Sequence, residues 1–242
     1  MKQIERLQVK IFADGADMES ILDLYKKPYI KGFTTNPTLM RKAGITNYED
    51  FSRKLIAAIP DRPIALEVLA DEFLEMEKQA HHIASWGKNV YVKIPITNTK
   101  GESSRPLITR LSNAGIRVNV TAVLTLNQVQ HVANAFKNDT SAIVSVFAGR
   151  IADTGVDPIP FMSKALEILR TCPKVELLWA SPRELLNIVQ ADQIGCHIIT
   201  ITSDILKKLS LLEKDLDEYS LETVAMFYND AMAAGYSIDS DY

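Results

Sequence analysis

The chain has 242 residues with 27 basic and 30 acidic side chains, so its formal charge of -3 leaves no basic excess of the kind that accompanies nucleic-acid binding. Cys172 and Cys196 are its only cysteines and have no metal-ligand spacing, which is typical of a cytoplasmic protein with reduced thiols and no disulfide. The start of the chain lacks the apolar core of a signal peptide, and no stretch approaches the roughly 18 apolar residues of a membrane span. We expect a soluble, unprocessed, cytoplasmic protein that acts on a small molecule, with no nucleic-acid or membrane partner.

Short β-branched runs recur along the chain and are separated by amphipathic helical patterns. The runs are residues 9–13, 32–35, 64–69, 90–94, 117–121, 143–147, 175–179 and 197–201, and the helical patterns include 71–86, 102–113, 126–137, 160–170 and 182–192. This alternation predicts one domain over residues 1–242 with the α/β fold of a (β/α)8 TIM barrel, and a doubly wound open sheet is the main competitor. We favour the barrel because several runs carry polar residues on the face that would line its lumen.

A further helical pattern at residues 220–234 follows the eighth run and has no strand to cover. Two roles are open for this extra C-terminal helix: packing against a neighbouring subunit, or capping the barrel.

A lysine interrupts the apolar strand at residues 89–96. Side chains alternate along a strand, so Tyr91, Lys93 and Pro95 share one face while the aliphatic residues share the other. If the aliphatic face packs on helices, Lys93 points into the lumen. A lysine held among apolar neighbours has a lowered pKa, which makes its amine available as a nucleophile for Schiff-base chemistry. A lysine at the strand end that extends to water is an equally open reading.

Other polar residues stand near the carboxyl ends of the predicted strands, where a barrel of this kind has its active site. They are Asp14, Thr35 and Asn36, Glu67, Asn119 and Thr121, and Ser145 beside Phe147. Taken singly, Asp14 could begin a helix, Asn36 could form a turn before Pro37, and Thr121 could be an ordinary strand residue. Glu67 is flanked by apolar residues on both sides, so its carboxylate must be solvated in a cavity or paired, and the lumen beside Lys93 offers both.

Two arginines follow strands six and seven at the same end of the barrel. Arg150 follows the sixth run, and Ser181-Pro182-Arg183 follows the seventh, where Pro182 is expected in the first helical turn. The two guanidinium groups, the Ser181 hydroxyl and the helix amides predict an anion site, and a solvated helix start at Arg183 is the alternative.

Five motifs carry a resemblance to a known family: Phe12-Ala13-Asp14-Gly15, Thr34-Thr35-Asn36-Pro37, Val92-Lys93-Ile94-Pro95, Phe147-Ala148-Gly149-Arg150 and Ala180-Ser181-Pro182-Arg183. In this order and spacing they resemble the transaldolase family, including its small fructose-6-phosphate aldolase-like branch, over about residues 9–205. The resemblance implies a class I mechanism in which Lys93 forms an imine with a ketose phosphate, without metal or cofactor.

The resemblance also implies a role for each of the other candidates. Asp14 would take and return the proton of the C4 hydroxyl, and Glu67 with Thr121 would hold the water that serves the imine. Asn36, Asn119 and Ser145 would bind the dihydroxyacetone hydroxyls, beside Thr35 and Phe147 in the substrate site. Arg150, Ser181 and Arg183 would hold the phosphate, although a sulfonate or another anion suits the same groups.

The implied activity is transfer of a dihydroxyacetone unit from a ketose phosphate, such as fructose 6-phosphate or sedoheptulose 7-phosphate, to an aldose phosphate in the pentose phosphate pathway. An aldolase that releases free dihydroxyacetone is the alternative within the same mechanism. We favour transfer because, in this resemblance, the aldolase members have glutamine at the position of Glu67, tyrosine at that of Phe147, and an apolar residue or glycine near Asn119. A barrel that binds a sugar phosphate without catalysis is the alternative from another class. Small members of the family also suggest a homo-oligomer, such as a decamer.

Overall fold

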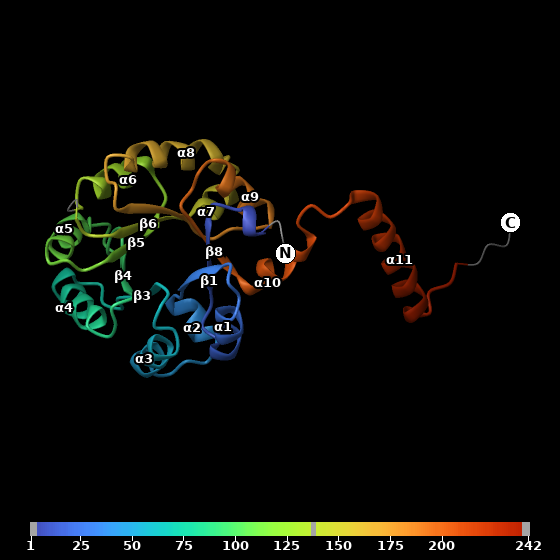
Figure 1. Cartoon of the computed structure of the whole chain (residues 1–242), viewed down its shortest axis with the longest axis horizontal. Helices are drawn as coiled ribbons and strands as arrows, with labels where there is room; N and C mark the ends of the chain where they lie inside the picture. Colours follow the sequence, from blue (N-terminus) through green and yellow to red (C-terminus); the bar gives the residue numbers. More distant parts are fainter. Residues whose placement is uncertain (1–3, 137–138, 239–242) are drawn as a thin grey trace.

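The strands of the computed structural model run parallel and pair in chain order until the last closes on the first (Figure 1). Within residues 4–136 and 139–238, which the structure describes, the strands are β1 (Lys10–Asp14), β2 (Ile30–Thr34), β3 (Ile64–Glu67), β4 (Val90–Pro95), β5 (Val118–Val123), β6 (Ala142–Val146), β7 (Val175–Trp179) and β8 (Ile198–Thr202). This arrangement confirms the TIM barrel and excludes the open sheet. The predicted run 175–179 coincides with β7, and the other predicted runs differ from their strands by one or two residues at an end.

Helices follow the strands and surround the barrel (Figure 1). They are the 3-10 helix η1 (Ile4–Arg6), α1 (Met18–Tyr25), α2 (Pro37–Lys42), α3 (Tyr48–Ala58), α4 (Phe73–Ala84), α5 (Arg105–Asn113), α6 (Leu126–Ala133), α7 (Ala148–Asp153), α8 (Pro158–Leu169), α9 (Leu186–Gln193), α10 (Ser203–Leu206), the 3-10 helix η2 (Lys207–Leu211) and α11 (Leu216–Ala234). The predicted pattern 126–137 extends past α6, and its last residue lies outside the described ones.

The predicted helix start at Pro182 is wrong, because α9 begins only at Leu186. The side-chain oxygen of Asn187 accepts hydrogen bonds from the backbone N–H groups of Arg183 and Glu184, at 2.8 and 3.2 Å. These bonds satisfy the two amides in a loop conformation, so the residues after β7 reach the barrel mouth before the helix starts.

Two apolar clusters fill the barrel wall and its lumen. The larger lies between the outward faces of the strands and the helices, and the smaller comprises Phe12, Ala65, Tyr91, Ile143, Leu178, Ala180 and Ile198. A Cβ on Gly32 would lie 2.5 Å from the Phe12 ring, so glycine at that position lets the ring cross the lumen. The smaller cluster closes the lumen below the polar strand ends, which leaves the carboxyl ends of the strands as its open side.

Helix α11 stands apart from the barrel in this chain (Figure 1). It ends at Gly235, whose φ of 68° is the left-handed conformation that glycine adopts at little cost. None of its residues is buried, and Leu221, Val224, Phe227 and Tyr228 are among its exposed large side chains. The sequence therefore predicted a C-terminal helix correctly, and in this chain the helix does not cap the barrel.

Candidate active site

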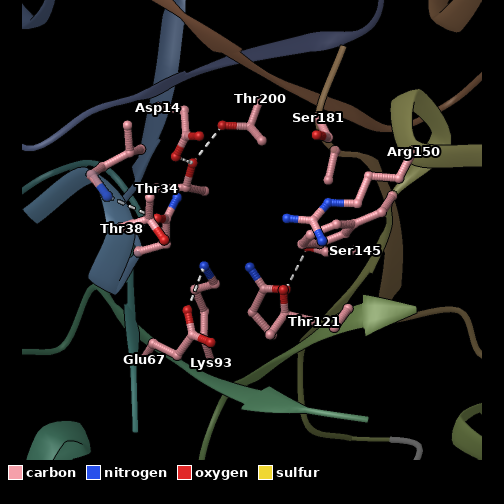
Figure 2. A pocket seen from close by; sticks show the side chains of 16 residues that line it. Asp14, Thr34, Thr38, Glu67, Lys93, Thr121, Ser145, Arg150, Ser181 and Thr200 are labelled. Carbon is pink, nitrogen blue, oxygen red and sulfur yellow. Dashed lines mark hydrogen bonds and ion pairs between the residues drawn. The ribbon is translucent and has the colours of Figure 1, made fainter. Parts of the chain in front are cut away.

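A cavity of about 390 Å³ opens at the carboxyl ends of the strands (Figure 2). Its lining combines ionisable, hydroxyl and amide side chains with a few apolar ones. The lining residues are Asp14, Thr34, Asn36, Thr38, Leu39, Glu67, Lys93, Asn119, Thr121, Ala122, Ser145, Phe147, Arg150, Ala180, Ser181 and Thr200. Ten of the twelve residues singled out in the sequence line it, and Thr35 and Arg183 do not.

Lys93 lies on β4 with only 7% of its surface exposed, so the reading in which it extends to water is wrong. Its Nζ atom is 3.0 Å from Oε2 of Glu67 and donates a hydrogen bond of 2.8 Å to the carbonyl oxygen of Thr35. The amine is therefore buried as expected, but among polar groups and not among the apolar neighbours that the sequence suggested. Glu67 and Lys93 are paired in the register of β3 and β4, which holds the carboxylate beside the amine.

Thr35 contributes its main chain to the site. Its carbonyl oxygen holds the amine of Lys93, while its buried hydroxyl has no hydrogen-bond partner among the described residues. The structure thus places Thr35 behind the cavity wall as a support for the lysine.

Asp14 lies at the end of β1 with its carboxylate beside the hydroxyl group of Thr34. The hydroxyl of Thr34 donates to Oδ1 of Asp14 at 2.7 Å, and the Thr34 oxygen lies 2.5 Å from that of Thr200. Burial raises the pKa of Asp14 above its usual value, and the nearby Glu67 carboxylate adds to the rise. Lys93 and the Thr34 hydrogen bond oppose that shift, so the raised pKa is the net result of desolvation.

Asn119 and Ser145 lie on the adjacent strands β5 and β6 and are hydrogen-bonded to each other. Ser145 donates to Oδ1 of Asn119 at 2.7 Å, and Nδ2 of Asn119 is buried without a hydrogen-bond partner among the described residues. A buried amide N–H that lines a cavity can donate to a ligand there, because leaving it unpaired costs free energy. Thr121 lines the same cavity. The next residue, Ala122, has a φ of 61°, which is a strained value for a residue with a side chain.

Asn36 begins α2 at the mouth of the cavity. Its side-chain oxygen accepts a hydrogen bond from the backbone N–H of Leu39 at 3.0 Å, and Pro37 follows in the first turn. The side chain is therefore held by its capping role and leaves its amide group at the cavity wall.

The anion site predicted from two arginines is only partly assembled. Arg150 lines the cavity (Figure 2). Its guanidinium lies over the ring of Phe147, another lining residue, at 5.1 Å from the ring centroid. Arg183 is instead bound to Asp153 through two hydrogen bonds of 2.9 and 2.5 Å. This pairing lowers the pKa of Asp153 and turns the second guanidinium away from the cavity.

Arg183 reaches the cavity only through Ser181. Its NH1 group donates to the Ser181 hydroxyl oxygen at 3.2 Å, and Ser181 lines the cavity with a φ of 61°. The predicted contribution of helix amides is absent here, since the N–H groups of Arg183 and Glu184 are bound to Asn187. Of the residues predicted for the anion site, Arg150 and Ser181 are the ones that line the cavity.

Nearly the whole chain matches a known family. Residues 11–239 match the sequence model described as "Transaldolase/Fructose-6-phosphate aldolase". The chain belongs to the transaldolase/fructose-6-phosphate aldolase family. Its resemblance to this family in the sequence motifs is confirmed.

Several proteins named as probable transaldolases are similar to this chain. A protein named "Probable transaldolase" from Dehalococcoides mccartyi (strain ATCC BAA-2266 / KCTC 15142 / 195) is 35% identical over 202 residues, which are 83% of this chain and 90% of that protein. One with the same name from Methanococcus maripaludis (strain C5 / ATCC BAA-1333) is 33% identical over 83% of this chain and 89% of its own length. Another from Thermoanaerobacter sp. (strain X514) is 31% identical over 95% of this chain and 100% of its own length.

Solved structures with the same fold are far more distant. A putative phosphonomutase from Burkholderia cenocepacia J2315 superimposes with a TM-score of 0.56 at 10% identity, over 95% of this chain and 97% of that one. A 3-hexulose-6-phosphate synthase gives 0.55 at 16% identity, over 81% and 90%. These likenesses show the barrel fold alone.

Several lining residues of this transaldolase-family barrel were given no role from the sequence, although Thr34 and Ala180 stand in two of its motifs. They are Thr34, Thr38, Leu39, Ala122, Ala180 and Thr200. Strand alternation could have found two of them, because Thr34 and Thr200 share the lumen face with Gly32 and Ile198 on their own strands. No residue of strand eight was among the predicted site residues.

Within residues 4–136 and 139–238, no helix is both long and apolar enough to cross a membrane. The same residues contain no group of three or more His, Cys, Asp or Glu side chains that could hold a metal ion.

Proposed function

We propose that this member of the family is a class I transaldolase that transfers a dihydroxyacetone unit through a Schiff base on Lys93. The donor is a ketose phosphate such as fructose 6-phosphate or sedoheptulose 7-phosphate, and the acceptor is an aldose phosphate, as in the pentose phosphate pathway. The observation that carries this proposal is the buried amine of Lys93, 3.0 Å from the Glu67 carboxylate, in a cavity that also contains Asp14. A site that only binds a sugar phosphate has no need of this arrangement, so we set the non-catalytic alternative aside.

Imine formation requires an amine nucleophile and a nearby acid-base group. The Lys93 nitrogen attacks the C2 carbonyl of the ketose, and the resulting carbinolamine loses water to give the protonated imine. We assign the movement of these protons to Glu67, whose carboxylate lies beside the Lys93 nitrogen. Thr121 lines the same cavity and would hold a water molecule there. General acid-base assistance of this kind contributes roughly 10²–10⁴ in rate.

Cleavage of the C3–C4 bond needs a base at the C4 hydroxyl. In the proposed step the Asp14 carboxylate takes the hydroxyl proton, the C4 oxygen becomes the carbonyl of the departing aldehyde, and the C3–C4 electrons move into the imine to give an enamine. The enamine then attacks the acceptor aldehyde, and Asp14 returns the proton to the new C4 oxygen. Its raised pKa brings Asp14 closer to the operating pH, which suits a group that both accepts and donates a proton.

Amide and hydroxyl groups around the cavity support the binding of a polyhydroxylated chain. We assign the dihydroxyacetone hydroxyls to Asn36, Asn119 and Ser145, of which Asn119 has the unpaired buried N–H. The phosphate is assigned to Arg150 and Ser181, with Arg183 acting through Ser181. A sulfonate on the ketose would meet the same groups and is the alternative for the anion.

Phe147 favours transfer over release of free dihydroxyacetone. It lines the cavity, and its ring offers no hydroxyl that could protonate the enamine. The enamine would then persist until an acceptor aldehyde arrives.

Fructose 6-phosphate with and without erythrose 4-phosphate distinguishes the two activities. We expect glyceraldehyde 3-phosphate to form quickly only when the acceptor is present, and Phe147→Tyr to raise the rate without acceptor. Fast release by the unaltered protein in the absence of acceptor would assign it to the aldolase activity.

Borohydride treatment in the presence of fructose 6-phosphate tests the Schiff base. Reduction should leave a covalent adduct that peptide mass spectrometry places on Lys93, and Lys93→Ala should fold but form none. Lys100→Ala is the matched control, since Lys100 is exposed and paired with Glu72 outside the cavity. An adduct that persists in Lys93→Ala would assign the chemistry to another lysine.

A further inference from the structure

Three adjacent strands bring one carboxylate and two hydroxyls together at the end of the barrel lumen. Asp14 and Thr34 are paired in the register of β1 and β2, and Thr200 comes from β8 on the other side of β1 (Figure 2). Both threonines are buried, at 5% and 6% exposure. Closure of the barrel therefore creates this group, since Thr200 reaches Thr34 only where β8 meets β1.

The distances fix the order of the three groups. Thr34 is in the middle, 2.7 Å from Oδ1 of Asp14 and 2.5 Å from the hydroxyl oxygen of Thr200. Each hydroxyl has one proton to donate and can also accept. An ionised carboxylate can only accept, so Thr34 must donate to Asp14 and Thr200 must donate to Thr34.

The same three groups can also bond when the carboxyl group is protonated. Its O–H can then donate to Thr34, and the Thr34 hydroxyl can turn about its C–O bond and donate to Thr200. No proton leaves either threonine in this change, because each hydroxyl only rotates. The chain of hydrogen bonds thus stays complete in both protonation states of Asp14.

We propose that Thr34 and Thr200 are positioning residues that orient Asp14 and reverse their hydrogen bonds each time it gains or loses a proton. This inference rests on the proposed function, in which Asp14 takes and returns the C4 proton. Among the described residues Thr200 makes its hydrogen bond to Thr34 and none to the carboxylate, so it acts through Thr34. Its hydroxyl strengthens the bond that Thr34 makes to the ionised form, so it favours the carboxylate that the cleavage step requires.

The charged groups that face Asp14 are Lys93 from β4 and Glu67 from β3, while the adjacent strands β2 and β8 contribute the two hydroxyls. Neither charge changes when a threonine is replaced. A shift in the titration of Asp14 on loss of a hydroxyl is therefore attributable to the hydrogen-bond chain.

The first test is the pH dependence of kcat/KM for transfer from fructose 6-phosphate to erythrose 4-phosphate. Thr34→Val removes the direct hydrogen bond and should move the acid limb to higher pH by about one unit. Thr200→Val should move it in the same direction by about 0.3 unit, since cooperative strengthening amounts to ~10–30% of a bond. Thr200→Ser keeps a hydroxyl and should restore the original profile.

Thr140→Val is the matched control for loss of a buried threonine hydroxyl. Thr140 donates to the carbonyl oxygen of Ser112 and does not line the cavity. We expect this variant to lose stability without moving the acid limb.

A second measurement follows Asp14 without relying on catalysis. Because its pKa is raised in the fold, the folded state binds more protons than the unfolded state, and the free energy of unfolding falls as pH rises from about 3.9. Thr200→Val should extend this fall to higher pH, and the extension should vanish when Asp14→Asn is added. If Thr200→Val does not fold, Thr200→Ala provides the same comparison.

The outcomes separate this inference from the proposed function. Unchanged profiles and unfolding curves in Thr200→Val, or a failure of Thr200→Ser to restore the profile, would overturn the role of the threonines while borohydride trapping on Lys93 still succeeds. Absence of trapping in the unaltered protein would overturn the proposed function, whereas the unfolding measurement would still report on the hydrogen-bond chain.

Discussion

The carbonyl oxygen of Ser181 lies so close to Gly149 that a Cβ on Gly149 would come within 1.6 Å of it. Gly149 is in the first turn of α7, and Ser181 is the second residue after β7, has a φ of 61° and lines the cavity. The contact therefore joins α7 to the loop after β7, and only a residue without a side chain permits it.

Gly149→Ala should displace Ser181 and weaken the hold on the substrate anion. We expect a loss of about 1–3 kcal/mol in the free energy of unfolding, because an added methyl group must push backbone aside. KM for fructose 6-phosphate should rise more than kcat falls. Gly15→Ala is the control for stability, since a Cβ there meets nothing within 4 Å, and an equal loss of stability in both variants would contradict the role of the contact.

Arg150 and Arg183 should differ in their effect on substrate binding. Arg150 lines the cavity, so Arg150→Ala should raise KM for phosphorylated ketoses by about 10–100-fold while hardly altering the reaction of dihydroxyacetone itself. Arg183→Ala should have a smaller effect, and Asp153→Ala should reproduce it, because the two residues hold each other. Steady-state kinetics of the three variants check this order. Equal increases in KM for Arg150→Ala and Arg183→Ala would contradict it.

Asp14→Asn should make the protein more stable while abolishing transfer. The raised pKa means that the carboxylate is unfavourable in the fold, so the gain should be absent below about pH 3.9, grow as pH rises, and persist at neutral pH. Asp17→Ala supplies the opposite case, because Asp17 caps α1 by accepting from the N–H of Ser20 at 2.8 Å, and its loss should cost ~1 kcal/mol. Urea unfolding at several pH values checks both variants, and a loss of stability in Asp14→Asn at neutral pH would contradict the assignment.

The homo-oligomer expected from the sequence stays a prediction, and α11 gives it a structural basis. Leu221, Val224 and Tyr228 recur at spacings of three and four along one side of this helix, and all are exposed by more than 60%. Apolar groups of this size on a helix without buried residues favour burial against a second copy of the chain. Sedimentation should show an assembly such as a decamer, and Val224→Glu should weaken it. A species of 27.0 kDa alone would exclude the oligomer.

Local regularities made the fold and most of the candidate site predictable. Alternation of side chains along a strand depends only on neighbouring residues. It therefore placed Lys93, Glu67 and Asn119 on the lumen face without knowledge of how the strands pair. The direction of the Arg183 side chain could not be predicted, because it depends on Asp153, thirty positions earlier at the end of α7. The start of α9 was missed for a related reason, since the side chain of Asn187 stabilises a loop that competes with the helix.

The pairing of β1 with β8 places Lys10 opposite Ile198. Nearly the whole length of the barrel sequence lies between these two residues. During synthesis, the edge of β1 that pairs with β8 therefore stays uncovered until β8 has left the ribosome. Contacts of such long sequence separation form slowly, because the entropy of closing the loop is lost before the pairing is gained. The nascent chain thus carries an open sheet edge for most of its synthesis, a period in which chaperone binding would protect it from pairing with other chains.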